Sequence, residues 1–410
     1  MTRIWSHVNP NNFKISKSFW RLAALWLALR LISSIFISFI SSLRPLTEIE
    51  QRIALLPPSE PLKAWLERAF IAPWLRWDAV WFTRIVTQGY HANDGTALFH
   101  PLYPLSAMPL YRLHIDPTLS LLLISALASL GLILLFERLA AMDLQPEAVR
   151  FSTLLLFFAP TAFVFFAPYT DGLFLMFAVL CVLWARKKSW WLAGLAGGLA
   201  ALTRQQGTFL LIPVAWEMWE SAEHDLRKLL ASWKQYISLG LIPAGYLFWI
   251  IYRTLVLSDV KPDLSRPLAF LSSLLLSPSG TNVVPIHGLL WPWEVVRLAV
   301  VKLLQAPDLD LIVNLILGAG FLVLLALAWK NMRWGYRLYA LAITIISFSF
   351  YTGPVHPYMG MPRHLLLAFP VFIGAAPKFD RPWKRLLVIG LSVAGWFSLL
   401  GLYGLEAWVP

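Results

Sequence analysis

Four stretches of roughly 20 mostly apolar residues constrain this chain more than any other feature. They cover residues 19–40, 119–141, 235–257 and 309–329, and each is close to the length of helix that crosses a bilayer. Hydrophobic residues fill 58% of the 410 positions and charged residues only 14%, which is far more apolar than a soluble domain. The sequence therefore predicts an all-α polytopic membrane protein.

Shorter apolar runs between these stretches raise the expected number of spanning or deeply buried helices to about eleven. The expected helices cover 18–40, 118–141, 150–168, 171–186, 190–203, 206–219, 235–257, 309–329, 335–351, 362–376 and 386–406. There is no internal repeat or low-complexity tract. We expect a single integral-membrane domain over residues 1–410, with a catalytic half at 18–220 and a more variable half at 235–406.

Lysine and arginine are unevenly distributed among the connections between these helices. Basic clusters occur at 186–188, 227–234, 330–337 and 378–385. If the N-terminus is cytoplasmic, all four clusters face the cytoplasm, as short basic connections should. The long loop 44–117 then faces the opposite side, and its segments 61–75 and 79–90 have the pattern of amphipathic helices that lie in the membrane interface. We expect a bacterial plasma-membrane protein whose active face is extracytoplasmic.

The net charge of +12 could in principle indicate nucleic acid. Its carriers are scattered between apolar runs, and no basic arm or aromatic RNA-binding motif collects them. Membrane topology explains the charge, and we expect no nucleic-acid partner.

Asp78 is the leading candidate for chemistry, because it lies between Trp77 and Trp81 in the first external loop. An aspartate before an amphipathic segment often caps a helix. Alternatively, the two indoles exclude water and tune a carboxylate that acts as a general base. Both interpretations stay open at this stage.

Other charged residues fall on the same predicted face as Asp78. Asp171 caps the helix that follows it or orients substrate. Arg204 anchors at the interface or binds phosphate or sugar. Arg363 forms a cationic cluster with His356 and His364, and it is costly to bury without an anionic partner such as phosphate.

Residues 99–104 read FHPLYP and contain His100 and Tyr103. The two prolines predict an irregular turn rather than a regular helix, and the aromatic residues suit a wall of a lipid or acceptor groove. His91 and Asp94 with His100 match no standard metal spacing, so we expect no metal site and no other cofactor.

Several of these stretches together resemble the PIG-V family of GPI mannosyltransferases, and in particular its prokaryotic relatives. The similar stretches are 77–82 (WDAVWF), 99–104 (FHPLYP), 167–174 (APYTDGLF), 201–207 (ALTRQQG) and 361–370 (MPRHLLLAFP). They appear in the family's order over most of the chain. The resemblance implies a GT-C fold and an inverting transfer of mannose from a polyprenyl-phosphate carrier to an external lipid or glycan acceptor. It also implies that Asp78 is the first-loop aspartate, that Asp171 stands at the second acidic position, and that Arg204 is the arginine after the fifth helix.

Two other classes of function compete with this one. A flippase or transporter of lipid-linked saccharides typically shows internal repeats and ionisable groups near the membrane midplane, and neither is clear here. A non-catalytic subunit that positions a partner transferase is the third class. Membrane lipids, a sugar donor and a lipid or glycan acceptor are the expected partners under the first hypothesis.

Overall fold

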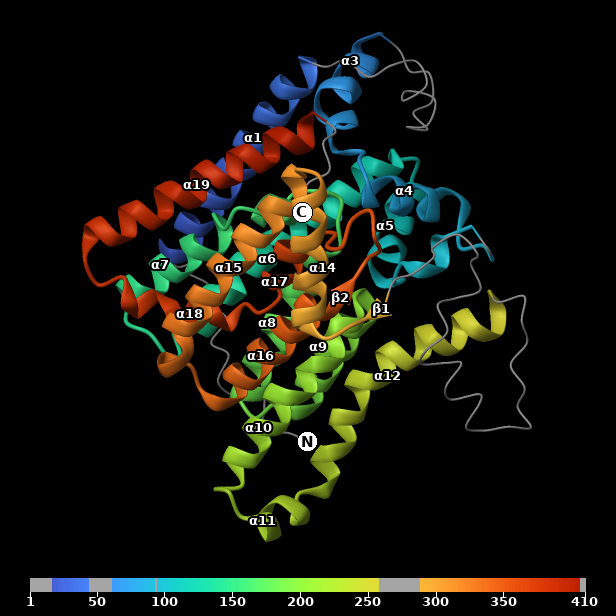
Figure 1. The fold of residues 1–410 in the computed structure, drawn as a ribbon. Coiled ribbons are helices and arrows are strands. Elements are labelled where there is room, and N and C mark those ends of the chain that lie inside the picture. Colours follow the sequence, from blue (N-terminus) through green and yellow to red (C-terminus); the bar gives the residue numbers. More distant parts are fainter. Residues whose placement is uncertain (1–16, 44–60, 93, 258–287, 406–410) are drawn as a thin grey trace.

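The computed structural model describes residues 17–43, 61–92, 94–257 and 288–405, and these are almost entirely helical (Figure 1). The α-helices of the first part are α1 (Lys17–Ser42), α3 (Pro61–Phe70), α4 (Asp78–Gln88), α5 (Leu102–Arg112), α6 (Pro117–Ala140), α7 (Pro146–Phe157), α8 (Asp171–Arg186), α9 (Trp190–Thr203), α10 (Leu211–Ser221), α11 (Leu226–Ala231) and α12 (Trp233–Val256). Those of the second part are α14 (Pro292–Gln305), α15 (Leu309–Ala328), α16 (Trp334–Ser349), α17 (Met361–Leu365), α18 (Pro370–Ala375) and α19 (Pro382–Gly404).

Short elements connect these helices. The 3-10 helices are η2 (Ala72–Trp74), η3 (Thr96–Leu98), η4 (Ala162–Phe165), η5 (Gln205–Leu210), η6 (Trp329–Asn331) and η7 (Ala376–Lys378). Strands β1 (Gly288–Leu289) and β2 (Phe350–Tyr351) form an antiparallel pair in which Gly288 lies opposite Tyr351. The prediction of an all-α fold is confirmed.

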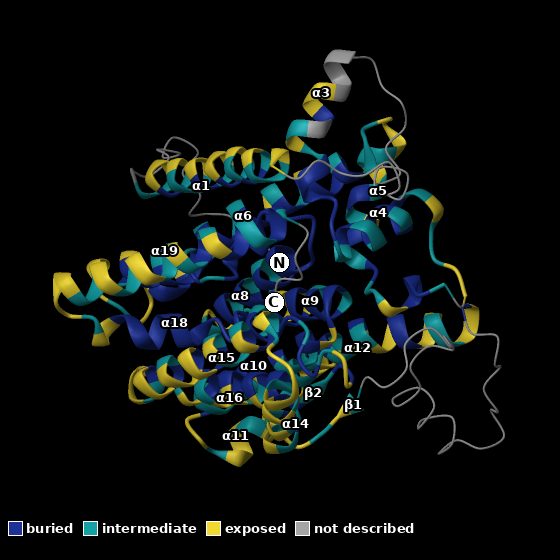
Figure 2. Cartoon of the chain, turned by 45° about the horizontal axis from the view of Figure 1, so that its top comes forward, coloured by how far each residue is buried: buried dark blue, intermediate teal, exposed yellow. Residues whose placement is uncertain are grey.

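Five helices in the described residues are long and apolar enough to cross a membrane. They are Ser18–Ser42, Pro117–Ala140, Trp233–Val256, Leu309–Asn331 and Pro382–Gly404. Figure 2 shows α1, α15 and α19 with exposed outward faces, and apolar side chains such as Leu127, Phe248 and Leu391 are more than 60% exposed. Exposed apolar surface on this scale is what lipid covers in an integral membrane protein.

Helix α8 lies at the centre of the molecule, packed against α6 and α9. Helices α9 and α12 approach each other through glycines. A Cβ atom added at Gly245 would lie 2.2 Å from the Gly198 carbonyl oxygen, and one at Gly194 would lie 2.1 Å from the Ser238 carbonyl oxygen. Only residues without a side chain allow two helix backbones to come so close, a familiar device of membrane helix pairs.

Several predicted helices are interrupted. The expected helix 150–168 ends at Phe157 and is followed, beyond Pro160, by η4; the expected helix 362–376 divides into α17 and α18 at Pro370. Proline lacks the backbone N–H donor, and its ring clashes with the carbonyl of the residue four positions earlier, so a regular helix does not continue through Pro160 or Pro370.

Two segments are more helical than predicted. Residues 102–104 form the first turn of α5, although an irregular turn was expected over 99–104. Pro101 precedes the helix and Pro104 lies in its first turn, where a missing N–H costs nothing. Residues 292–305, expected to be part of a loop, form α14. The predicted interfacial segments correspond to α3 and α4, with η2 between them.

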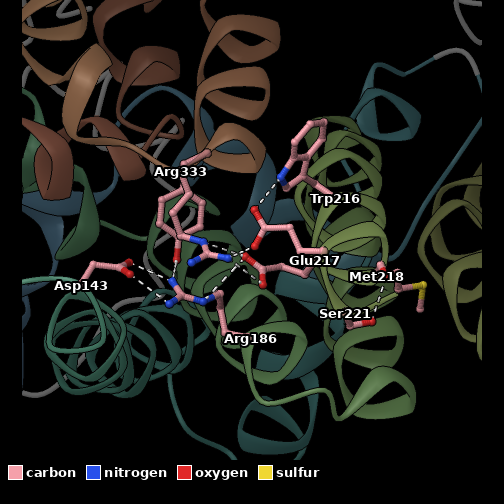
Figure 3. A network of polar contacts seen from close by, with 9 residues as sticks. Asp143, Arg186, Trp216, Glu217, Met218, Ser221 and Arg333 are labelled. Atoms are coloured by element: carbon pink, nitrogen blue, oxygen red, sulfur yellow. Dashed lines mark hydrogen bonds and ion pairs between the residues drawn. The ribbon is translucent and has the colours of Figure 1, made fainter. Parts of the chain in front are cut away.

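The two ends of α8 carry different polar clusters. Asp171 is its first residue and Arg186 its last, so they lie about 22 Å apart along the helix axis. Figure 3 shows Arg186 between Asp143, at 2.8 and 2.9 Å, and Glu217, which Arg333 also contacts at 3.2 Å. This ion-pair network ties α8, α10 and the start of α16 together far from Asp171.

Candidate active site

Asp78 is presented by an unusual turn. The backbone carbonyl of Arg76 accepts a hydrogen bond from the Ala79 N–H at 3.0 Å. Trp77, which follows Arg76, has φ +52° and ψ −119°. These angles are those of the first central residue of a type II′ turn, a position that normally holds glycine. A tryptophan in this conformation costs roughly 1–3 kcal/mol, and such strain is concentrated at functional sites.

Four charged residues from four separate parts of the chain meet beside this turn. Arg363 on α17 lies 2.8 Å from Asp78 through Nη1 and donates through Nε to Asp171 at 2.9 Å. Arg204 donates to the other oxygen of Asp171 at 2.6 Å. We call Asp78, Asp171, Arg204 and Arg363 the four-charge cluster; Arg363 bridges its two carboxylates.

Local backbone geometry places Arg204. It follows α9 in an extended conformation, with φ −155° and ψ 146°, before the chain turns back into η5. The turn brings Gly207 against α9, where an added Cβ would lie 2.3 Å from the Ala201 nitrogen. The stretch 201–207 is therefore a tight reversal that holds the Arg204 side chain next to the start of α8.

Burial distinguishes the two carboxylates. The Asp171 side chain is fully buried, whereas that of Asp78 is 30% exposed. Asp171 is thus enclosed by its two arginines, and Asp78 is the carboxylate that a second reactant can reach.

Electrostatics distinguish the two arginines. Burial opposes the charge of Arg363, but the neighbouring Asp171 and Asp78 outweigh it and raise the pKa of its guanidinium. For Arg204, burial dominates over the attraction of Asp171 and lowers the pKa. The formal charges of the two arginines and the two aspartates cancel within the cluster.

Tyr169 completes the wall beneath Arg363. The guanidinium lies over its ring at 4.4 Å, and burial raises the pKa of the Tyr169 phenol, which keeps it neutral. Its ring packs against Tyr403, whose hydroxyl donates to the Trp74 carbonyl at 3.1 Å. Sequence reasoning missed both tyrosines; the position of Tyr169 two residues before Asp171 was the available signal.

The helix-cap interpretations of both aspartates are wrong. Trp77 is the N-cap of α4 and Thr170 that of α8, and neither makes a side-chain cap hydrogen bond. Asp78 and Asp171 are instead the first residues of their helices. Their carboxylates are directed to arginines, and the positive ends of two helix dipoles add to the charge around them.

The predicted aromatic and histidine residues lie around α4 and α5. Trp81 stacks on Phe99 at 5.8 Å, and the buried Tyr103 shares its hydroxyl between Ser125 and the Leu121 carbonyl. The His100 ring bonds to the Ala201 carbonyl at 3.1 Å, and burial, followed by the charge of Arg253, lowers its pKa to about 3. Tyr103 and His100 therefore serve as packing and hydrogen-bonding groups of the surrounding wall.

The cationic cluster predicted at 356–364 is divided. Arg363 joins the four-charge cluster, and burial followed by the charges of Arg204 and Arg363 lowers the pKa of His364. His356 lies beside Asp308, which is paired with Lys302 at 2.7 Å.

Two of the residues weighed as metal ligands, His91 and Asp94, contact other protein groups. His91 contacts the Gln88 carbonyl at 2.9 Å, and Asp94 pairs with Arg84 at 3.0 Å. In the part of the chain that the structure describes, no three histidine, cysteine or acidic residues converge on a possible metal position.

Comparison with known proteins identifies the family. The sequence matches the mannosyltransferase (PIG-V) family over residues 25–258, more than half of the chain. The chain belongs to this family. No match was found among curated proteins.

Two solved structures of ArnT from Cupriavidus metallidurans are similar to this PIG-V family member. The structure bound to undecaprenyl phosphate has a TM-score of 0.50 at 15% identity, and the similarity covers 92% of this chain and 64% of that one. The apo structure gives 0.48 at 15% identity, over 90% and 62%. The chain thus spans less than two thirds of the ArnT length, and its fold is of the GT-C type.

Proposed function

We propose that this chain transfers a hexose, with mannose the first candidate, from a polyprenyl-phosphate carrier to a hydroxyl of a lipid or glycan acceptor, with inversion at the anomeric carbon. Membership of the mannosyltransferase (PIG-V) family supports mannose as the transferred sugar. The undecaprenyl phosphate bound to the similarly folded ArnT supports the carrier. The observation that carries the proposal is Arg363 bridging a reachable carboxylate, Asp78, and a buried one, Asp171.

The bridge suits a reaction in which phosphate leaves. A donor phosphodiester carries one negative charge, and the departing phosphate monoester gains another as the sugar–oxygen bond breaks. Arg363 and Arg204 would hold that developing charge, because guanidinium groups match phosphate oxygens with paired hydrogen bonds. Asp171 would keep both arginines in place.

Asp78 would act on the acceptor. When Arg363 turns towards the phosphate, the Asp78 carboxylate is released from its ion pair and can accept the proton of the acceptor hydroxyl. The acceptor oxygen then attacks the anomeric carbon from the face opposite the phosphate. One glycosidic bond forms, one sugar–phosphate bond breaks, and the proton resides on Asp78 until solvent removes it.

The topological assignments belong to the same proposal. We place the four-charge cluster on the extracytoplasmic side of a bacterial plasma membrane, and the Arg186 network with Lys187 and Lys188 on the cytoplasmic side, in agreement with the positive-inside tendency. The division into a catalytic half and a variable half also stays a proposal, with Arg363 as the contribution of the second half to the site.

The test is a transfer assay with the purified protein in detergent. Radiolabelled polyprenyl-phosphate-mannose, and separately other polyprenyl-phosphate sugars, are incubated with a host lipid extract. The product is identified by mass spectrometry, and its anomeric configuration is determined by NMR. A mannosylated lipid or glycan with the opposite anomeric configuration supports the proposal. Movement of intact carrier across proteoliposomes without a new glycosidic bond would identify a flippase instead.

A further inference from the structure

Two polar residues share one face of the otherwise apolar helix α15. Asp310 and Asn314 are one turn apart, and Asn314 is completely buried. A buried amide in an apolar helix is costly unless its donors and its acceptor are satisfied. The groups that satisfy the Asn314 amide therefore indicate its structural role.

Asp310 fixes which way the Asn314 amide points. The Asn314 Nδ2 donates to the Asp310 carbonyl at 2.9 Å and to its carboxylate at 3.0 Å. The Asp310 backbone carbonyl can only accept, so the NH₂ end of the amide must face it. The amide oxygen is consequently directed away, towards α17.

That oxygen accepts a hydrogen bond from the first residue of α17. The Met361 N–H donates to Asn314 Oδ1 at 3.2 Å, while the preceding Gly360 has φ +71° and no side chain to cap the helix. The opening N–H groups of a helix lack intrahelical acceptors, and here a neighbouring helix supplies one. Gly318, one turn further along α15, lies against the Met361 side chain, since an added Cβ would be 2.4 Å from its terminal carbon.

Arg363 is only two residues beyond this contact. Its bridge needs 2.8 and 2.9 Å distances to two carboxylates from different helices. A five-residue helix has little rigidity of its own, so its attachments to α15, to α16 and, through the Pro362 carbonyl, to Thr161 together fix where the guanidinium lies.

We infer that Asn314, oriented by Asp310, is a positioning residue that sets α17 so that Arg363 can bind the donor phosphate. The inference rests on the proposed function for the role of Arg363. The attachment of α17 itself does not depend on that function.

The test combines two independent measurements on Asn314→Leu, which keeps the side-chain size and removes the acceptor. Hydrogen–deuterium exchange of the peptide covering 361–367 is expected to become faster. In the transfer assay, kcat/KM for the donor is expected to fall about 10- to 100-fold, as for other small displacements of a positioning group, with the acceptor KM unchanged.

Two further variants separate positioning from general damage. Asn331→Leu removes a 3.0 Å bond from Asn331 to the Gly374 carbonyl at the other end of the same apolar run, and it should change neither measurement. Asp310→Leu removes the carboxylate that accepts from the Asn314 amide at 3.0 Å but leaves the Asp310 carbonyl and the acceptor for Met361 in place. It should therefore lower donor kcat/KM less than Asn314→Leu does.

The outcomes distinguish the two levels of the argument. If the unaltered protein transfers no sugar, the proposed function fails, whereas the exchange measurement still tests the attachment of α17. The inference is overturned if Asn314→Leu leaves exchange at 361–367 unchanged, if faster exchange leaves donor kinetics unchanged, or if Asn331→Leu has the same effects.

Discussion

Trp77 holds a backbone conformation suited to glycine, directly before the carboxylate that meets Arg363. Glycine has no steric penalty at positive φ, whereas alanine retains it. We therefore expect Trp77→Gly to be more stable than Trp77→Ala by about 1 kcal/mol in the free energy of unfolding, the reverse of the usual order. Thermal unfolding of both variants in one detergent checks this; an alanine variant as stable as the glycine variant would contradict the strained turn.

Arg363 acts through the shape of its guanidinium as well as its charge. Lysine keeps the charge but cannot reach two carboxylates in fixed directions. For Arg363→Lys we expect transferase kcat/KM to fall about 100-fold. Arg84→Lys is the matched control, because Arg84 also pairs with an aspartate, Asp94 at 3.0 Å, outside the four-charge cluster. Equal losses in both variants would argue against the bridge.

Helices α9 and α12 depend on glycine for their contact. A methyl group at Gly245 would overlap the Gly198 carbonyl at 2.2 Å, whereas Gly240 on the same helix has nothing within 4 Å. We expect Gly245→Ala to destabilise the protein by about 1–3 kcal/mol and Gly240→Ala to be neutral or to stabilise it by up to about 1 kcal/mol. Melting temperatures of the pair decide the matter, and equal values would mean that the two helices are further apart.

The sequence predicts elements well where apolar runs are long and poorly where prolines and short helices occur. The runs that became α6, α12 and α15 are clear from length alone. Pro160 and Pro370 divide expected helices, and α5 forms because its early proline occupies a position that needs no donor. Neither the spacing of apolar residues nor the composition shows whether a given proline will interrupt a helix or lie in its first turn.

The site was predictable residue by residue but not as an arrangement. Asp78, Asp171, Arg204 and Arg363 each stand out as charges next to apolar runs. Their pairing depends on four elements far apart in the chain. Asn314 gave no signal, because a single amide in an apolar run has no visible partner until Met361, 47 residues away, is placed beside it.

On the scale of the whole molecule, the two ends of α8 should lie in different compartments. The background is Cys181→Ala, which removes the chain's single, buried cysteine. Ala92 follows α4, in the same predicted external loop as Asp78, and we expect Ala92→Cys in intact cells to react with a membrane-impermeant maleimide. Lys188→Cys should react only after permeabilisation, because basic connections face the cytoplasm. The reverse pattern would invert the proposed orientation.

The central claim is that Asp78 is the general base that accepts the proton of the acceptor hydroxyl. The most direct measurement is a single-turnover assay with labelled polyprenyl-phosphate-mannose, comparing the unaltered protein with Asp78→Asn and with Asp94→Asn, a nearby aspartate paired with Arg84. We expect the transfer rate to fall by about 10²–10⁴-fold in Asp78→Asn, as for loss of a general base, with melting temperature and donor binding retained and Asp94→Asn unaffected. A folded Asp78→Asn variant that transfers sugar at the original rate would contradict the assignment.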